Sequence, residues 1–218
     1  MNSPGRTFPW TITIGLLLIL LTLALAFVLA NLNSRKPHVS SLLVYNQIAD
    51  FTLTNQNGAA VSLTNLRGQV WVADIIFTRC PGPCLRMTKQ MKELETALKS
   101  TTGVKLISLT TDPEFDTPEV LKRYAERFEA DSNRWEFLTG TKKQIGDLAI
   151  NSLKLAAIEK KPEDRESEND LFVHSTIFVV VDKRGQLRGV FETVGEGVDW
   201  PESRKNILDA VKELRKEG

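Results

Sequence analysis

The sequence predicts an α/β domain that follows an N-terminal apolar helix. Residues 7–34 carry no charged side chain, and most of that run is apolar. Beyond residue 48, near-continuous apolar runs alternate with segments of helical periodicity. Their order is strand, helix, strand and helix, followed by a strand pair and a last helix. This order is typical of a sheet with parallel central strands and helices on its faces.

Composition excludes several classes of protein. The chain has 218 residues, of which 42% are hydrophobic and 25% are charged. These values are those of a globular protein, and they exclude wholesale disorder and a multi-spanning membrane protein. The net charge is +1 and no basic run stands out, so we expect no nucleic-acid partner. Two cysteines exclude a disulfide-dense scaffold and a four-cysteine zinc site.

The N-terminal run has the length of a membrane span. Residues 12–30 are almost wholly apolar, and about 20 such residues in a helix cross a ~30 Å hydrocarbon core. We interpret residues 1–32 as one transmembrane helix that serves as an anchor, and residues 33–47 as a tether. The alternative is a cleaved signal peptide, although the run exceeds the usual ~7–15 apolar residues. We expect a bacterial plasma membrane, with the domain facing the periplasm or the cell exterior.

The remaining residues, 48–218, are expected to form one domain. The expected strands are 51–54, 60–63, 70–77, 104–109, 135–138 (at an edge), 176–181 and 187–192, and the expected helices are 85–100, 116–128, 142–153 and 199–216. The first two strands form a hairpin around the turn Asn55-Gln-Asn-Gly58. The charged run 159–170 is interpreted as a solvated loop. This order is a thioredoxin-like layout with an extra N-terminal hairpin.

The two cysteines, Cys80 and Cys84, lie where the apolar strand 70–77 leads into a helix. A helix N-terminus stabilises a thiolate, which is the form that acts as nucleophile or metal ligand. If the segment is helical, the four-residue spacing puts both sulfurs on one face, where they could form a disulfide or bind one metal ion. A purely structural disulfide or two inert core thiols is the simpler alternative. Two thiolates are soft ligands that suit Cu(I), and an added imidazole would also suit Cu(II).

His174 is the only histidine inside the expected domain, at the entry to strand 176–181. In a thioredoxin-like layout this entry lies near the first strand-to-helix turn, so a ligand role is open beside that of an ordinary core histidine. For Asp112 and Asp116, a place at the mouth of the site is open, and turn and capping roles are favoured. Met87 and Met91 could offer thioethers to copper, and they are interpreted as core side chains.

Several motifs together resemble one known family. They are Phe77-Thr-Arg-Cys80-Pro-Gly-Pro-Cys84, Thr111-Asp112-Pro113 with Asp116-Thr117-Pro118, Trp135-Glu-Phe-Leu-Thr-Gly140 and Val173-His174-Ser175-Thr176. Over about residues 48–214, the chain resembles the SCO/SenC family of copper-binding, thioredoxin-fold proteins that assist cytochrome c oxidase assembly.

The resemblance implies a copper site, Cu(I) or Cu(II), formed by Cys80, Cys84 and His174. It implies a membrane-tethered chaperone, acting as a monomer, whose partner is cytochrome c oxidase subunit II or another copper client. Two positions depart from many members of the family. Leu85 stands where proline is common, and Val173 stands where aspartate is common.

Two enzymatic alternatives use the same thiols. In a thiol-disulfide reductase, Cys80 would attack a client disulfide and Cys84 would resolve the mixed disulfide. In a thiol peroxidase, peroxide would oxidise one thiol to a sulfenic acid. The other thiol would then condense with the sulfenic acid. The chaperone interpretation, by contrast, requires no catalysis.

Overall fold

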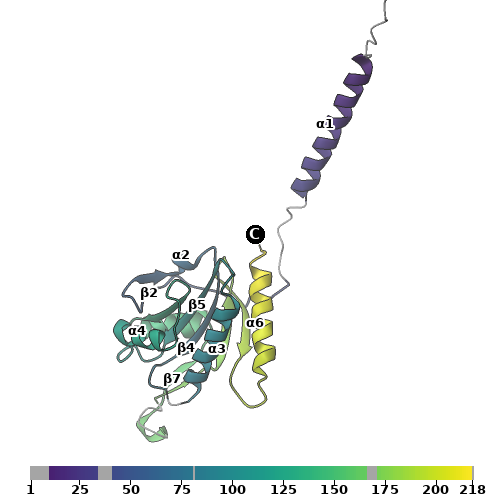
Figure 1. The fold of residues 1–218 in the computed structure, drawn as a ribbon. Coiled ribbons are helices and arrows are strands. Elements are labelled where there is room, and N and C mark those ends of the chain that lie inside the picture. Colours follow the sequence, from purple (N-terminus) through teal and green to yellow (C-terminus); the bar gives the residue numbers. More distant parts are fainter. Residues whose placement is uncertain (1–9, 34–40, 81, 166–170, 218) are drawn as a thin grey trace, which may run out of the picture. The chain divides into compact units, whose positions relative to one another are not determined.

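The computed structural model describes residues 10–33, 41–80, 82–165 and 171–217. The chain divides into two compact units, Met1–His38 and Val39–Gly218, which are considered separately. The first unit contains the helix α1 (Trp10–Asn33; Figure 1). The leucine and isoleucine side chains of α1 from Ile14 to Leu25 are exposed. Within the described ranges, no helix reaches the combination of length and hydropathy that counts as a membrane span.

The second unit is an α/β domain. Its strands are β1 (Asn46–Gln47), β2 (Thr52–Asn55), β3 (Ala60–Ser62), β4 (Val70–Ile76), β5 (Val104–Thr110), β6 (Trp135–Thr139), β7 (Ala157–Glu159), β8 (Phe172–His174), β9 (Ile177–Val181) and β10 (Gln186–Glu192). Its helices are α2 (Leu63–Leu66), α3 (Pro83–Ala97), α4 (Pro118–Arg127), α5 (Lys142–Gly146), the π-helix η1 (Asp147–Ser152), the 3-10 helix η2 (Pro162–Asp164) and α6 (Trp200–Leu214).

Eight strands form one mixed sheet in the order β1-β10-β9-β4-β5-β6-β2-β3. The central strands β4, β5 and β6 run parallel, and the other neighbours pair antiparallel. β4 and β5 pair over their whole length, from Val70 opposite Val104 to Ile76 opposite Thr110. β7 and β8 form a separate two-stranded ribbon. Parallel pairing therefore brings the loops that follow β4 and β5 to one edge of the sheet.

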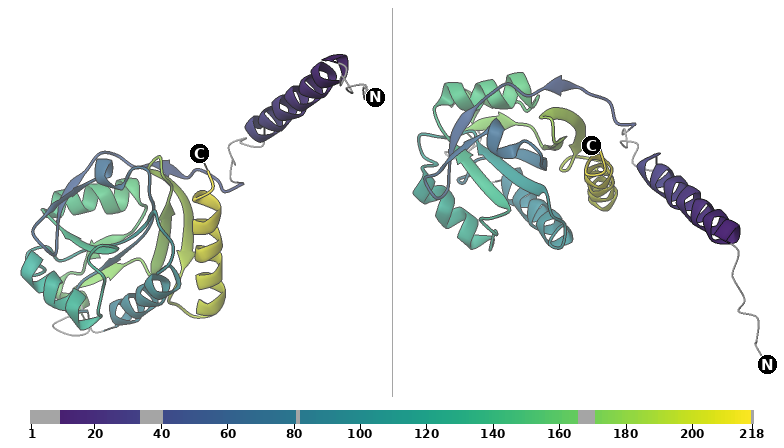
Figure 2. Two further views of the ribbon diagram at one scale, coloured as in Figure 1. Left: turned by 45° about the horizontal axis from the view of Figure 1, so that its top comes forward. Right: turned by 90° about the horizontal axis from the view of Figure 1, so that it is seen from above.

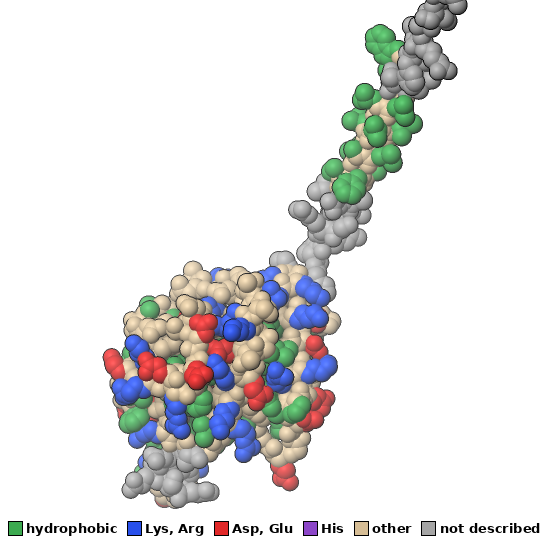
Figure 3. Space-filling view, viewed as in Figure 1, with side chains coloured by type: hydrophobic (Ala, Val, Ile, Leu, Met, Phe, Trp, Pro, Cys, Tyr) green, Lys and Arg blue, Asp and Glu red, His purple; other side chains and the backbone are tan. Residues whose placement is uncertain are grey.

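Helices cover both faces of the sheet (Figure 2). One core contains side chains of α3, α4 and α6 with Val72 and Ile76 of β4. The other core contains α2, α5 and η1 with Trp71 and Ile75 of the same strand. Every residue of β4 is buried, as expected for a central strand covered on both faces. On the face that Figure 3 shows, acidic and basic side chains are interspersed.

The α/β fold expected from the sequence is confirmed, and several elements differ from expectation. β6 is not an edge strand, because β2 pairs with it on its outer side. The segment 142–153 is helical, but it changes from α5 to the π-helix η1. The charged run 159–170 begins in β7 and continues into η2, and its residues 166–170 lie outside the described residues, as does His38.

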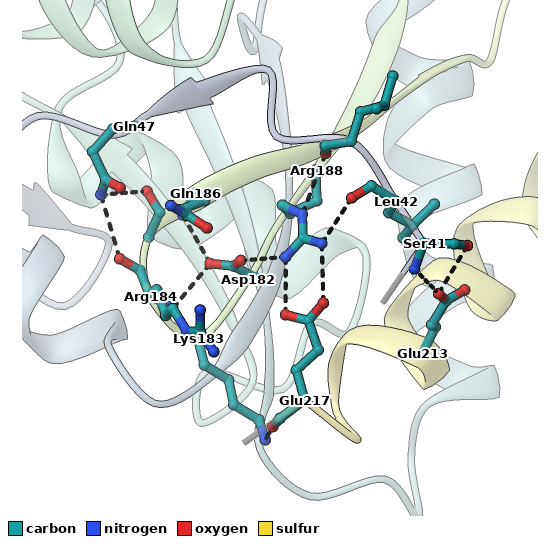
Figure 4. Close-up of polar contacts among 12 residues, drawn as sticks. Ser41, Leu42, Gln47, Asp182, Lys183, Arg184, Gln186, Arg188, Glu213 and Glu217 are labelled. Carbon is teal, nitrogen blue, oxygen red and sulfur yellow. Dashed lines mark hydrogen bonds and ion pairs between the residues drawn. The ribbon is translucent and has the colours of Figure 1, made fainter. Parts of the chain in front are cut away.

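The segment expected to be the end of the tether makes sheet contacts. Asn46 and Gln47 form β1, which pairs with β10. Just before β1, the backbone oxygens of Leu42 and Leu43 accept hydrogen bonds from the guanidinium of Arg188 at 2.8 and 3.3 Å (Figure 4). The domain therefore includes residues that precede position 48.

Arg188 joins three parts of the domain through buried ion pairs and hydrogen bonds. Its guanidinium is 2.7 Å from the carboxylate of Asp182 and 2.9 Å from that of Glu217, and all three residues are at most 6% exposed. Glu217 lies just beyond α6, whereas Asp182 lies in the turn between β9 and β10. The pair with Glu217 thus connects the β9–β10 hairpin to the residues beyond α6, and the hydrogen bonds to Leu42 and Leu43 connect the hairpin to the entry of the domain, as Figure 4 shows.

Replacing Arg188 should destabilise the domain strongly. Arg188→Met leaves two buried carboxylates without their cation, which typically costs about 3–5 kcal/mol of unfolding free energy. Urea denaturation followed by circular dichroism measures the change. Lys205→Met, which removes an exposed pair with Asp209, is the matched control and should leave the unfolding free energy essentially unchanged. Equal stability of the Arg188→Met variant and the wild type would contradict this structural role.

Candidate metal centre

The two cysteines lie in the loop and helix that follow β4. Cys80 belongs to the loop, and its backbone N–H donates to the carbonyl of Phe77 at 3.2 Å. Cys84 is the second residue of α3, directly after Pro83. Proline suits the first turn of a helix because its missing N–H would have no partner inside the helix. The segment from Cys80 to Cys84 is thus not one helix, and the loop rather than helical spacing brings the cysteines together.

The cysteines are thiols, and no disulfide joins them. Cys84 is buried, with 1% of its surface exposed, whereas Cys80 is half-buried. The backbone N–H of Phe77 donates to the Cys84 sulfur at 3.5 Å. Burial raises the pKa of Cys84 far above that of an ordinary thiol, and a hydrogen bond with the Cys80 side chain raises it further. The two sulfurs are therefore in contact, and Cys80 is the one that solvent reaches.

Polar side chains lie close to the two thiols. The hydroxyl groups of Thr88 and Tyr124 are 2.9 Å apart, and Thr88 also donates to the carbonyl of Cys84 at 2.8 Å. Burial raises the pKa of Tyr124, so its hydroxyl is neutral. Asp74, inside β4, is fully buried and has an unfavourable electrostatic interaction with a Cys84 thiolate. These surroundings favour the protonated form of Cys84.

The loop after β5 holds the residues that precede Cys80. Asp116, which is fully buried, accepts hydrogen bonds from the backbone N–H of Thr78 at 3.1 Å and from the hydroxyls of Thr78 and Thr110 at 2.5 Å each. Burial raises the pKa of Asp116, and these three donated bonds oppose that effect. The capping role expected for Asp116 is wrong, because Thr117 caps α4 by accepting from the N–H of Val120.

A second contact joins the same two loops. The guanidinium of Arg79 lies 2.6 Å from the carboxylate of Asp112 and 4.1 Å from the centre of the Phe115 ring. Thr78 and Arg79, the two residues directly before Cys80, are therefore both attached to the segment 110–116. These particular contacts were not predicted from the sequence. Both loops follow neighbouring parallel strands, and this position could have indicated that they lie close together.

The backbone of His174 lies in β8, paired with Ala157 of β7, but its side chain is outside what the structure describes. Phe172 on the same strand packs edge-on against Phe77, with ring centroids 5.2 Å apart. β8 thus lies beside the loop that carries Cys80. Among the side chains that are described, no cluster of three or more His, Cys, Asp or Glu residues is placed to hold a metal.

Met87 and Met91 are fully buried in the core beneath α3, as expected from the sequence. The structure thus provides two soft sulfur donors in contact, one of them accessible, at the N-terminus of a helix. Such a pair can bind a soft cation or undergo oxidation to a disulfide.

Comparisons with known proteins agree with this description. The SCO1/SenC family model matches residues 43–207, a range that includes both cysteines and His174. A SCO1 protein homolog of Bacillus subtilis is 39% identical over 143 residues, which are 65% of this chain and 71% of the relative.

Two solved structures share the fold. BsSco, described as a member of the Sco family of cytochrome c oxidase assembly proteins, superposes with a TM-score of 0.66 at 32% identity, covering 82% of this chain and 98% of BsSco. ScoI of Bradyrhizobium japonicum with copper bound superposes with a TM-score of 0.61 at 25% identity, covering 77% of this chain and 99% of ScoI. The chain belongs to the SCO1/SenC family.

Proposed function

We propose that this protein is a membrane-tethered copper chaperone that delivers copper to cytochrome c oxidase subunit II and acts as a monomer. Cys80, Cys84 and His174 bind the copper. The observation that carries the proposal is the contact between the two thiols at the junction of β4 and α3, in a chain of the SCO1/SenC family. The description of a relative as an oxidase assembly protein supports the choice of client.

The donor set suits copper as cargo. Two thiolates favour Cu(I), and one imidazole extends the site to Cu(II). A positive ion between the sulfurs offsets the burial that otherwise keeps Cys84 protonated, so copper binding releases its proton. Copper is present in the solved structure of ScoI from Bradyrhizobium japonicum. The half-buried Cys80 gives the cargo a route to a partner.

The tether and location belong to the same proposal. The run of residues 7–34 without charge supports an anchor in the bacterial plasma membrane. The domain then faces the periplasm or the cell exterior, where a client copper site is accessible.

Two residues beside the proposed ligands depart from the family pattern. Val173, which directly precedes His174, provides no carboxylate to orient the imidazole, and Leu85 is 39% exposed beside Cys84. We expect these two departures to affect copper release and client choice.

Anaerobic copper titration of the reduced full-length protein in detergent tests the site. The wild type should bind one copper per chain. His174→Ala should lose Cu(II) binding and retain weakened Cu(I) binding, because two thiolates remain. His38→Ala, which alters the only other histidine, is the matched control and should behave as the wild type. A wild-type protein without a stoichiometric site, or equal Cu(II) binding by both histidine variants, would refute the copper assignment.

A thiol-disulfide reductase is the second candidate, and the different environments of the two thiols favour a definite order of attack. The Cys80 thiolate would attack a client disulfide, forming a mixed disulfide and releasing one client thiolate. Cys84 would then lose its proton and attack the Cys80 sulfur, closing a Cys80–Cys84 disulfide and releasing the second client thiolate. Cys84 is the poorer first nucleophile because burial raises its pKa.

Trapping in cells tests this candidate. With Cys84→Ser, the mixed disulfide on Cys80 cannot be resolved, so a covalent complex should accumulate and be visible on non-reducing gels. Cys80→Ser, the matched control, should trap nothing, because the buried Cys84 attacks slowly. The reductase candidate fails if neither variant forms a covalent complex. It also fails if both variants form one to the same extent.

A further inference from the structure

The two residues directly before Cys80 are attached to the segment 110–116. Thr78 donates two hydrogen bonds to Asp116, and Arg79 pairs with Asp112. A loop outside regular secondary structure takes its conformation from the groups that hold its backbone. The position of the Cys80 sulfur relative to Cys84 therefore depends on contacts outside the loop.

Asp116 makes the most enclosed of those contacts. Two of its three hydrogen bonds are to Thr78, one to the backbone N–H and one to the hydroxyl, and the third anchors it to Thr110 at the end of β5. Thr110 pairs in register with Ile76, the last residue of β4. The carboxylate thus joins the end of one central strand to the loop that leaves the other, two residues before Cys80.

The burial of Asp116 indicates that this contact is maintained. A buried carboxylate is costly unless hydrogen bonds compensate, and those bonds are lost if the loop moves away. Movement of Thr78 would leave a fully buried acceptor with one partner instead of three. The Arg79–Asp112 pair is a weaker second contact, because the Arg79 side chain is 34% exposed.

We propose that Asp116 is a positioning residue for the copper site, holding Thr78 so that the Cys80 sulfur stays against Cys84. This inference rests on the proposed function for its copper readout, but the geometry concerns the two thiols whatever they bind. Groups that orient metal ligands without touching the metal typically change metal affinity by about 10- to 100-fold when removed.

Four variants distinguish positioning from general stability. Asp116→Ala removes all three hydrogen bonds, whereas Thr78→Val removes only the bond from the Thr78 hydroxyl. Thr78→Val replaces the alanine variant in the test if that variant does not fold. Asp116→Asn is the conservative variant. Its amide oxygen can accept from the Thr78 N–H and from Thr110, and its NH₂ can donate to the Thr78 hydroxyl. Thr117→Ala removes the neighbouring cap of α4 and is the matched control.

Two probes are titrated into the reduced full-length variants. One is Cu(I) in competition with a chelator, and the other is phenylarsine oxide, whose arsenic binds two adjacent thiols without copper chemistry. Asp116→Ala should bind both probes about 10- to 100-fold more weakly, and Thr78→Val should shift both in the same direction. Asp116→Asn should restore near wild-type binding, and Thr117→Ala should leave both affinities unchanged while lowering the midpoint of thermal unfolding.

Wild-type affinities for both probes in Asp116→Ala would overturn the proposal, as would equal weakening in Thr117→Ala. If the alanine variant does not fold, wild-type affinities in Thr78→Val overturn it instead. If the wild-type protein binds the arsenical but no Cu(I), the copper function fails, and the arsenical series alone decides whether Asp116 positions the thiols.

Discussion

Parallel pairing of β4 and β5 is the constraint on which the rest of the site depends. Because the two strands pair in register to their last residues, the loops that follow them leave the sheet side by side. One loop carries Cys80 and leads into α3, and the other carries Asp112 and Asp116. The hydrogen bonds to Thr78 and the ion pair to Arg79 are consequences of this proximity.

The central strands could be predicted from sequence because burial on both faces requires apolar residues throughout. The runs that became β4, β5 and β9 show this directly. β1, β7 and β8 could not be predicted, since each has only two or three residues and depends on a partner strand rather than on its own pattern. β6 was recognised as a strand, but its interior place follows from pairing with β2, more than 80 residues earlier in the chain.

Part of the site could also be predicted from the sequence. The cysteine pair is evident from its position between an apolar strand and a helix. The contact between the thiols, however, comes from the loop and not from helical spacing. Asp116 resembled a helix cap because it precedes Thr117 and Pro118, yet its carboxylate bonds to residues on other elements. The residues next to Asp116 in the sequence suggest a hydrogen bond within the helix that follows it. Its actual partners, Thr78 and Thr110, become evident only from the register of the two parallel strands.

The central claim is that both sulfurs and one imidazole bind a single copper ion. X-ray absorption at the copper edge of the stoichiometrically loaded protein tests it most directly, because the method counts sulfur and nitrogen ligands around the metal. The account predicts two sulfur ligands for Cu(I), and two sulfurs with an imidazole nitrogen for Cu(II). Copper surrounded only by nitrogen and oxygen, or by a single sulfur, would contradict it.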